Sequence, residues 1–385
     1  DRLYVNDGRG GFSRAADALP AIHENGATVV PGDFDADGDV DLFVGSRVVS
    51  RAYGRTPRSH LLRNDGRGRF ADVTRELAPV LGAAGMVTSA AWLPRPDGRL
   101  DLVVVGEWMP VRVFRQENGR LVDRTEAAGL AGSAGWWNVV TAADLNGDGR
   151  QDLVLGNLGL NAYLRASADR PARMYVHDFG GTGAVKGIIT FDKGDDGPRL
   201  LAGRDDLVRL IPALRSRYPS YAAFGASRAE DVFGDELRKA QVLEARTFAS
   251  AVAIADGAGR FALRPLPVEA QLAPVRAALA EDVDGDGCVD LLLAGNVHGV
   301  PPALGRHDAS HGLLLRGAGD GSFVAVDAAA SGVTIDGEVR HLRAVRLAGG
   351  GRAVAVARND DTPRVLQVSS PPPAVAAGVA SRTPR

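Results

Sequence analysis

The segment Asp33-Phe34-Asp35-Ala36-Asp37-Gly38-Asp39-Val40-Asp41 decides how this 385-residue chain is expected to fold. Two further copies of its pattern occur, at residues 144–152 and 282–290. Each copy has oxygen-bearing side chains at positions 1, 3, 5 and 9 and Gly at position 6, and an apolar run follows directly. Because several carboxylates at one turn repel one another, the pattern favours a loop that surrounds a cation.

Calcium is the cation that this donor pattern predicts, because Ca²⁺ binds six to eight oxygen ligands in proteins. The Gly at position 6 allows a left-handed backbone that folds the loop around the ion. Position 7 is expected to contribute its main-chain carbonyl, which explains why its side chain differs among the copies. The predicted metal residues are Asp33, Asp35, Asp37, Asp39 and Asp41, then Asp144, Asn146, Asp148, Arg150 and Asp152, and finally Asp282, Asp284, Asp286, Cys288 and Asp290.

An EF-hand is the obvious alternative for such a loop, but it ends in a bidentate Glu at position 12 and joins two helices. Position 12 is occupied here by Val44, Leu155 and Leu293, which cannot bind calcium. The flanking residues 28–30 and 42–44 have the composition of short strands. The motif is therefore interpreted as a strand–calcium loop–strand unit, and acidic turns without a metal remain the alternative.

Glycine-rich hairpins accompany the acidic loops along the chain. They occur at residues 3–12, 61–70, 252–261 and 313–323. A first strand, an acidic loop, a second strand and an outer hairpin make four antiparallel strands per repeat of about 50 residues, which is typical of a β-propeller blade. Loops at residues 93–101 and 178–186 keep the spacing but lack the full set of oxygens, and no calcium is predicted in either of them.

Two segments do not follow the repeat. Residues 200–246 have helical spacing and composition, which predicts a helical insertion within or between blades. Residues 369–385 begin with consecutive prolines followed by small residues, which predicts a disordered tail. The propeller is therefore expected to span residues 1–368.

Composition excludes several classes of protein. The formal net charge of -2 gives no electrostatic basis for binding nucleic acid or a membrane surface. The chain lacks an apolar run of about 20 residues that could span a membrane, and its single cysteine, Cys288, excludes an intrachain disulfide. The sequence starts at Asp1 within a hairpin pattern, which indicates a mature form or a fragment of a longer parent chain with further domains, with any signal peptide outside it.

The calcium loops and several further segments resemble FG-GAP/VCBS repeats, the blades of the integrin α-subunit propeller. The resemblance is greatest to bacterial VCBS-repeat proteins associated with ASPIC/UnbV domains, which are similar to cartilage acidic protein. It implies an all-β, seven-bladed propeller, for which six blades are the alternative, with calcium in blade loops. It also implies a secreted, periplasmic or cell-surface location and adhesion rather than catalysis. The segments that carry it are residues 106–110, 135–138, 156–161, 270–275 and 305–309.

Polar and aromatic residues follow the second strands of successive repeats, at the end opposite the calcium loops. Equivalent positions in rotationally related blades lie on one face, so these residues are predicted to converge at one mouth of the propeller. Two alternatives stay open: the Trp and Asn side chains pack between blades and cap turns, and the histidines between His298 and His311 bind a transition metal. The predicted ligand-binding residues are Glu107, Trp108, Asn157, Asn161, Asn296 and His307.

These observations predict a calcium-stabilised extracellular module that binds a glycan or a protein ligand. No catalytic residue is predicted, since the sequence has neither a Gly-x-Ser-x-Gly nucleophile motif nor a phosphate-binding glycine loop. The alternative is a polysaccharide-active lyase or hydrolase on the same scaffold.

Overall fold

The chain consists mostly of antiparallel β-sheets, as the sequence predicts. The computed structural model describes residues 1–192, 194, 197–301 and 304–368, so the predicted disordered tail lies outside the described residues. No helix in this part of the chain is long and apolar enough to cross a membrane. A separate hairpin of β1 (Leu3–Asn6) and β2 (Phe12–Ala15) precedes the first sheet.

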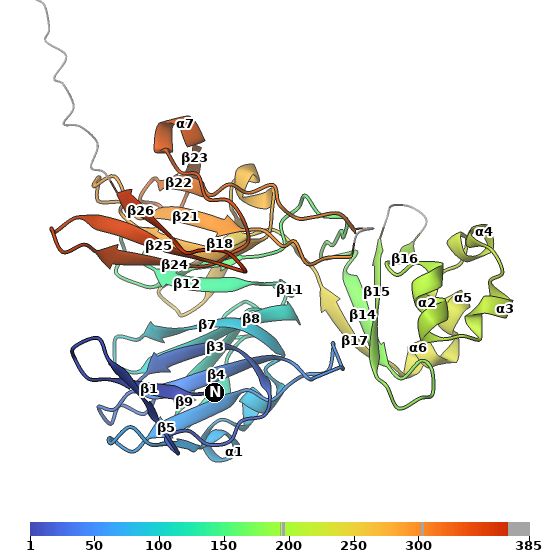
Figure 1. Cartoon of the computed structure of the whole chain (residues 1–385), viewed down its shortest axis with the longest axis horizontal. Coiled ribbons are helices and arrows are strands. Elements are labelled where there is room, and N and C mark those ends of the chain that lie inside the picture. The colour runs from blue at the N-terminus through green and yellow to red at the C-terminus, as the bar shows by residue number, and fades with distance from the viewer. Residues whose placement is uncertain (193, 195–196, 302–303, 369–385) are drawn as a thin grey trace, which may run out of the picture.

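Five sheets with the same strand order follow one another in the described residues (Figure 1). The first contains β3 (Asn25–Gly32), β4 (Asp41–Val48), β5 (His60–Asn64) and β6 (Phe70–Asp72). The second contains β7 (Met86–Pro94), β8 (Leu100–Met109), β9 (Arg112–Glu117), β10 (Arg120–Asp123) and the short β11 (Gly135–Trp136). The third contains β12 (Val139–Ala143), β13 (Asp152–Gly156), β18 (Ala251–Ala255) and β19 (Phe261–Pro265). The fourth contains β20 (Val275–Glu281), β21 (Asp290–Gly295), β22 (Leu313–Gly317) and β23 (Phe323–Val326), and the fifth β24 (Val339–Arg346), β25 (Arg352–Arg358) and β26 (Arg364–Val368).

Apolar side chains between consecutive sheets form the core. The first and second sheets share one cluster that includes the fully buried Phe43 and Phe114, and the second and third share another that includes Trp137. Similar clusters join the third sheet to the fourth and the fourth to the fifth. The first strands β3, β7, β12, β20 and β24 are neighbours in this order. The second strands of the first four sheets are buried along most of their length on both faces, so each contains a continuous apolar run in the sequence.

Short helices connect these sheets. They are α1 (Thr74–Leu77), η1 (Pro79–Ala83), η2 (Val268–Gln271) and α7 (Ala328–Ser331).

A unit of about 90 residues is inserted between β13 and β18 of the third sheet. Its own sheet has the order β16 (Pro198–Leu200), β15 (Lys186–Asp192), β14 (Ala172–His177) and β17 (Gln241–Ala245). Five short helices cover it: α2 (Arg204–Leu210), α3 (Leu214–Arg217), α4 (Tyr221–Gly225), α5 (Ala229–Phe233) and α6 (Asp235–Lys239). In Figure 1 this unit stands to the right of the other sheets.

The predicted helical insertion at 200–246 contains the five helices between Arg204 and Lys239, but it also includes strand β17, and it belongs to a larger inserted unit. The loop at 178–186 joins β14 to β15 in the sheet of this unit. The hairpin at 252–261 is β18–β19, which completes the sheet begun before the insertion. The sheets described here do not close into a ring, and the predicted number of blades, seven or six, is not confirmed.

Candidate functional site

The three acidic loops occupy the same place in their sheets, between the first and the second strand. In each loop the carboxylate at position 1 accepts hydrogen bonds from two backbone N–H groups of the turn. Asp33 accepts from Asp37 at 3.1 Å and from Gly38 at 3.0 Å. Asp144 and Asp282 accept from the equivalent turns, each of which includes the N–H at position 6. The loop is therefore folded by its own side chains before any ion is considered.

The Asp at position 9 begins the second strand and is buried in every copy. One oxygen of Asp41 accepts the N–H of Phe34 at 3.2 Å, and the other accepts the N–H of Asn64 at 2.7 Å. Asp152 and Asp290 each make the same pair of bonds, to loop position 2 and to the last residue of the neighbouring third strand. This residue consequently ties the loop to the sheet, a role that the sequence pattern alone did not reveal.

Two positions in each loop have a left-handed backbone, whereas the sequence analysis identified only one. Position 6 is Gly in all copies, with φ between 82° and 94°. Position 4 also has positive φ, at 72° for Gly147 and 83° for Gly285, but in the first loop it is Ala36 at 62°. The Gly-x-Gly pattern of the second and third loops is the signal that could have shown this requirement.

The first loop contains a buried carboxylate oxygen with no protein partner. Oxygens of Asp33, Asp35 and Asp37 lie within 4.8 Å of one another, and Oδ1 of Asp35 is buried without a hydrogen bond in the described structure. Burial and repulsion from Asp37 and Asp33 raise the pKa of Asp35. Burial also raises the pKa of Asp41 to about 6, although two N–H groups favour its ionised form. A divalent cation would satisfy this orphaned oxygen and offset the repulsion, so the residues present fit calcium.

The other two loops differ in how their charge is balanced. Asp282, Asp284 and Asp290 form a second group whose oxygens lie within 4.8 Å, and Arg316 pairs with Asp284 at 2.9 Å. In the loop at 144–152, Asn146 donates to Asp148 at 2.9 Å and the guanidinium of Arg150 also pairs with Asp148. Arg150 was predicted to contribute its main-chain carbonyl; in the structure its side chain partly neutralises the negative charge of the loop.

The loop predicted to have lost calcium contains protein cations instead. Arg115 of β9 donates to the buried Asp101, at position 9, with distances of 3.1 Å from Nε and 2.8 Å from a terminal nitrogen. Arg95, at position 3, pairs with Asp97 at 2.9 Å and lies 3.8 Å from Asp101. Two guanidinium groups therefore neutralise the carboxylates that would otherwise surround a metal ion in this loop.

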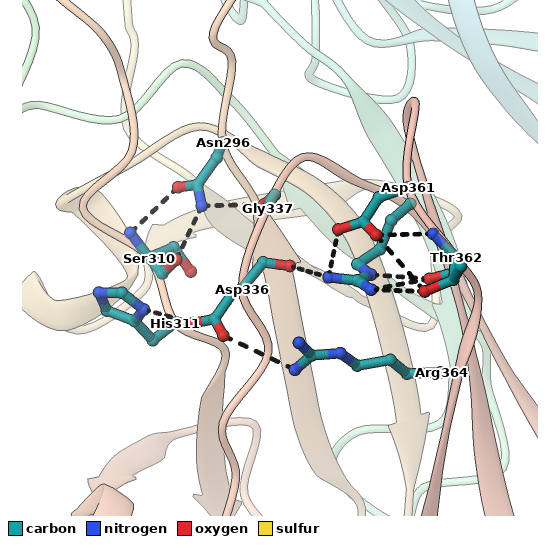
Figure 2. A network of polar contacts seen from close by, with 9 residues as sticks. Asn296, Ser310, His311, Asp336, Gly337, Asp361, Thr362 and Arg364 are labelled. Carbon is teal, nitrogen blue, oxygen red and sulfur yellow. Dashed lines mark hydrogen bonds and ion pairs between the residues drawn. The ribbon is translucent and has the colours of Figure 1, made fainter.

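Four of the predicted ligand-binding residues are buried, namely Glu107, Trp108, Asn157 and Asn296. Asn157 and Asn296 directly follow β13 and β21, and their side chains are 0% and 2% exposed. Figure 2 shows Nδ2 of Asn296 donating to the carbonyls of Ser310 at 2.7 Å and Gly337 at 3.0 Å, while its Oδ1 accepts the N–H of Ser310. Asn157 makes similar bonds with the carbonyls of Thr247 and Ala249. Both asparagine side chains thus hold neighbouring loops in place by hydrogen bonds to their main chains, which agrees with the alternative that these residues have a structural role.

Glu107 and Trp108 end β8 and belong to one buried network. Glu107 accepts two hydrogen bonds from Arg47, at 2.6 and 3.0 Å, and one from the hydroxyl of Tyr53 at 2.7 Å. Trp108 Nε1 in turn donates to that hydroxyl at 3.1 Å, and the Trp108 ring lies 5.7 Å from the ring of Trp136. Trp108 is 4% exposed and is not available for stacking on a ligand.

A cavity of about 340 Å³ lies at this end of the strands, between the sheets and the inserted unit. Two of the predicted ligand-binding residues, Glu107 and His307, line it. Arg47, Trp136, Asn138 and Arg276 also line it, and sequence reasoning did not select them. Asn161 is exposed and donates to the carbonyl of Leu272 at 3.1 Å instead.

The histidines between His298 and His311 have separate surroundings. The N–H of His298 donates to Glu338. Nδ1 of His311 lies 2.9 Å from Asp336 (Figure 2). Among the described residues, only acidic side chains form groups of three or more suitable metal ligands. The structure thus offers no support for a transition-metal site here.

Comparisons with known proteins support the repeat assignment. Residues 96–155 match the model of the FG-GAP-like repeat. This segment extends from the loop with protein cations through β13, and therefore includes the loop at 144–152. A closer relation to ASPIC/UnbV-associated proteins is not established. No curated protein matches the chain in sequence.

Among solved structures, the crystal structure of the V. cholerae biofilm matrix protein Bap1 is similar, at 13% identity and a TM-score of 0.29. The match covers 89% of this chain and 52% of that one, so the chain spans about half the length of that protein. A TM-score this low does not establish a common fold.

Proposed function

We propose that this chain is a calcium-stabilised extracellular module that binds a glycan or a protein ligand. The observation that carries the calcium assignment is the buried, unpartnered Oδ1 of Asp35 within a group of three carboxylates. The FG-GAP-like match at 96–155 supports a repeat scaffold of this type. Calcium would be held by the side-chain oxygens at positions 1, 3, 5 and 9, which are carboxylates except at Asn146, and it would cross-link the turn.

The position of these loops supports a structural role for the ion. Each loop joins the first and second strands of its sheet, and its position-9 Asp bonds to the last residue of the third strand. An ion bound there would connect all three inner strands of one sheet. Ligand binding is then assigned to the opposite ends of the second strands, where Glu107 and His307 line the cavity.

A binding role fits the cavity better than a catalytic one. Glu107 is the carboxylic acid in the cavity wall, and a carboxylic acid is the usual catalytic group of a glycosidase. It already accepts three hydrogen bonds from Arg47 and Tyr53. A general acid or base must reach the reacting atom of a substrate, and these hydrogen bonds already engage both carboxylate oxygens of Glu107. The enzyme alternative therefore has no specific support from this site.

Calcium titration of protein freed of metal by chelation tests the first part of the proposal. Isothermal titration calorimetry is expected to detect uptake at millimolar or lower calcium, as in other extracellular modules. At about 100 times the dissociation constant, one independent site adds roughly 2.7 kcal/mol to the free energy of unfolding. Asp37→Ala should remove one such increment, whereas the matched variant Asp97→Ala should keep the wild-type calcium response. Equal losses in the two variants would contradict the assignment.

Ligand recognition is tested with a glycan array and a panel of extracellular proteins, probed with calcium-loaded and chelated protein. Selective capture that weakens after chelation is expected, because calcium holds the native sheets. Absence of selective capture in both panels would contradict the binding role without affecting the calcium assignment.

A further inference from the structure

Arg276 and Arg340 are both extra residues in the pairing of their strands. On β20, Val275 pairs with Gly295 and Ala277 with Ala294, so Arg276 is an additional residue in the ladder. On the neighbouring strand β24, Arg340 is additional in the same way. Such bulges redirect a side chain away from the regular alternation. The cavity-lining position of Arg276 is the result.

In the described part of the chain, the carboxylates near Arg276 pair with other residues, so its guanidinium has no carboxylate partner. Glu107 pairs with Arg47, and Glu338 accepts hydrogen bonds from His298 and Asn359 and lies 3.5 Å from Arg340. Arg276 has one hydrogen bond in the described structure, to Oδ1 of Asn138 at 3.4 Å, and its Nε is buried without a partner. These three arginines and two glutamates carry a net charge of +1.

The same environment makes this positive charge costly. Burial, together with repulsion from Arg340 and Arg47, lowers the pKa of Arg276 to about 10, although Glu107 and Glu338 oppose the shift. A buried cation without a partner is destabilising unless a counter-ion neutralises it. Because Arg276 lines the cavity and has only a long bond to Asn138, a counter-ion would lie in the cavity beside its guanidinium.

The rest of the cavity wall is mostly apolar. Leucine, isoleucine, valine and proline side chains from the sheets and the inserted unit predominate, and the indole of Trp136 contributes an aromatic surface. A pocket of this size with an apolar wall and few polar groups is typical of small-molecule sites. Inside the cavity itself, a sugar with many hydroxyls would leave most of its hydrogen bonds unsatisfied, which favours a compact apolar ligand with one charged group. The glycan or protein of the proposed function would instead contact the surface around the cavity.

We propose that this cavity binds a small organic monocarboxylate, whose carboxylate pairs with the guanidinium of Arg276 and whose apolar body packs against Trp136 and the aliphatic wall. Arginine is suited to this role because its planar nitrogen donors can bind both oxygens of a carboxylate. The site lies at the opposite ends of the second strands from the calcium loops, so it does not depend on the proposed calcium binding.

Benzoate and its neutral analogue benzamide are suitable probes, because they share shape and differ in charge. Isothermal titration calorimetry with calcium-loaded protein should show saturable binding of benzoate at millimolar or lower concentration, and binding of benzamide weaker by about tenfold or more. Equal affinities for the two probes, or a lack of saturation with benzoate, would overturn the proposal. This comparison requires no variant protein.

Arg276→Met tests the residue itself, with Arg264→Met on β19 as a charge-matched control outside the cavity. Arg276→Met should lower benzoate affinity by about tenfold or more, while Arg264→Met should bind as wild type does. Because the variant removes an unpaired cation, its melting temperature without benzoate should equal or exceed that of the wild type. Wild-type benzoate affinity in Arg276→Met would overturn the assignment.

Discussion

Relief of backbone strain at Ala36 should stabilise the protein. Ala36 occupies position 4 of the first acidic loop with φ 62°, where the other two loops have Gly147 and Gly285. A left-handed conformation costs an L-residue about 1–2 kcal/mol, and replacing Ala36 with Gly removes this cost. The greater conformational freedom of Gly in the unfolded chain offsets roughly 0.5–1 kcal/mol of the resulting stabilisation. Ala36→Gly should therefore raise the free energy of unfolding by about 0.5–1 kcal/mol.

The reverse substitution in the other loops should have the opposite sign. A Cβ built at Gly147 or Gly285 has no atom within 4 Å, so any loss in Gly147→Ala or Gly285→Ala comes from φ and not from contact. Each should lower the free energy of unfolding by a similar amount. Gly257→Ala is the control, because that glycine has equally open surroundings without positive φ, and its change should be neutral or slightly stabilising.

Urea denaturation of chelated protein, followed by tryptophan fluorescence, measures these differences as shifts in the midpoint at constant slope. Chelation removes calcium binding from the comparison. A decrease in stability for Ala36→Gly, or equal effects of Gly147→Ala and Gly257→Ala, would refute the reasoning about position 4.

Three further outcomes are expected. Gly156→Ala should lower the melting temperature markedly, by about 2 kcal/mol or more in stability, because its new Cβ would lie 2.5 Å from the carbonyl oxygen of Val275; a wild-type melting temperature would contradict the close packing of these sheets. Arg115→Ala should cost about 2 kcal/mol in urea denaturation with or without calcium, since the buried Asp101 loses its bidentate partner; an effect seen only with calcium would contradict the assignment of protein cations to this loop. Although burial opposes it, hydrogen bonds from Thr74 and His60 lower the pKa of Asp72, so its stabilisation is present above the ordinary pKa of an aspartate and is lost as the pH falls through the lowered value. Thermal melts across this acidic range should therefore show a shallower loss of stability for Asp72→Asn than for wild type, and parallel curves would argue against it.

The sequence by itself determined the local features of this protein. Spacing of oxygen side chains and glycine predicted the three acidic loops, and the apolar runs after them predicted the second strands that the structure contains. The departures at Arg95 and Lys186 also indicated which loops lack the donor set. These predictions succeed because a turn and the strand that follows it depend on residues close in sequence.

The tertiary structure alone decided which distant segments meet. The hairpin at 252–261 completes a sheet whose second strand ends at Gly156, and no local pattern shows that a whole inserted unit separates them. Burial of Asn157 and Asn296 likewise depends on carbonyl groups far along the chain, as does the isolation of the Arg276 guanidinium. Strand pairing, burial and the balance of charges are sums over residues distant in sequence, so a local pattern can suggest polar groups at a site but cannot tell which of them remain free to bind a ligand.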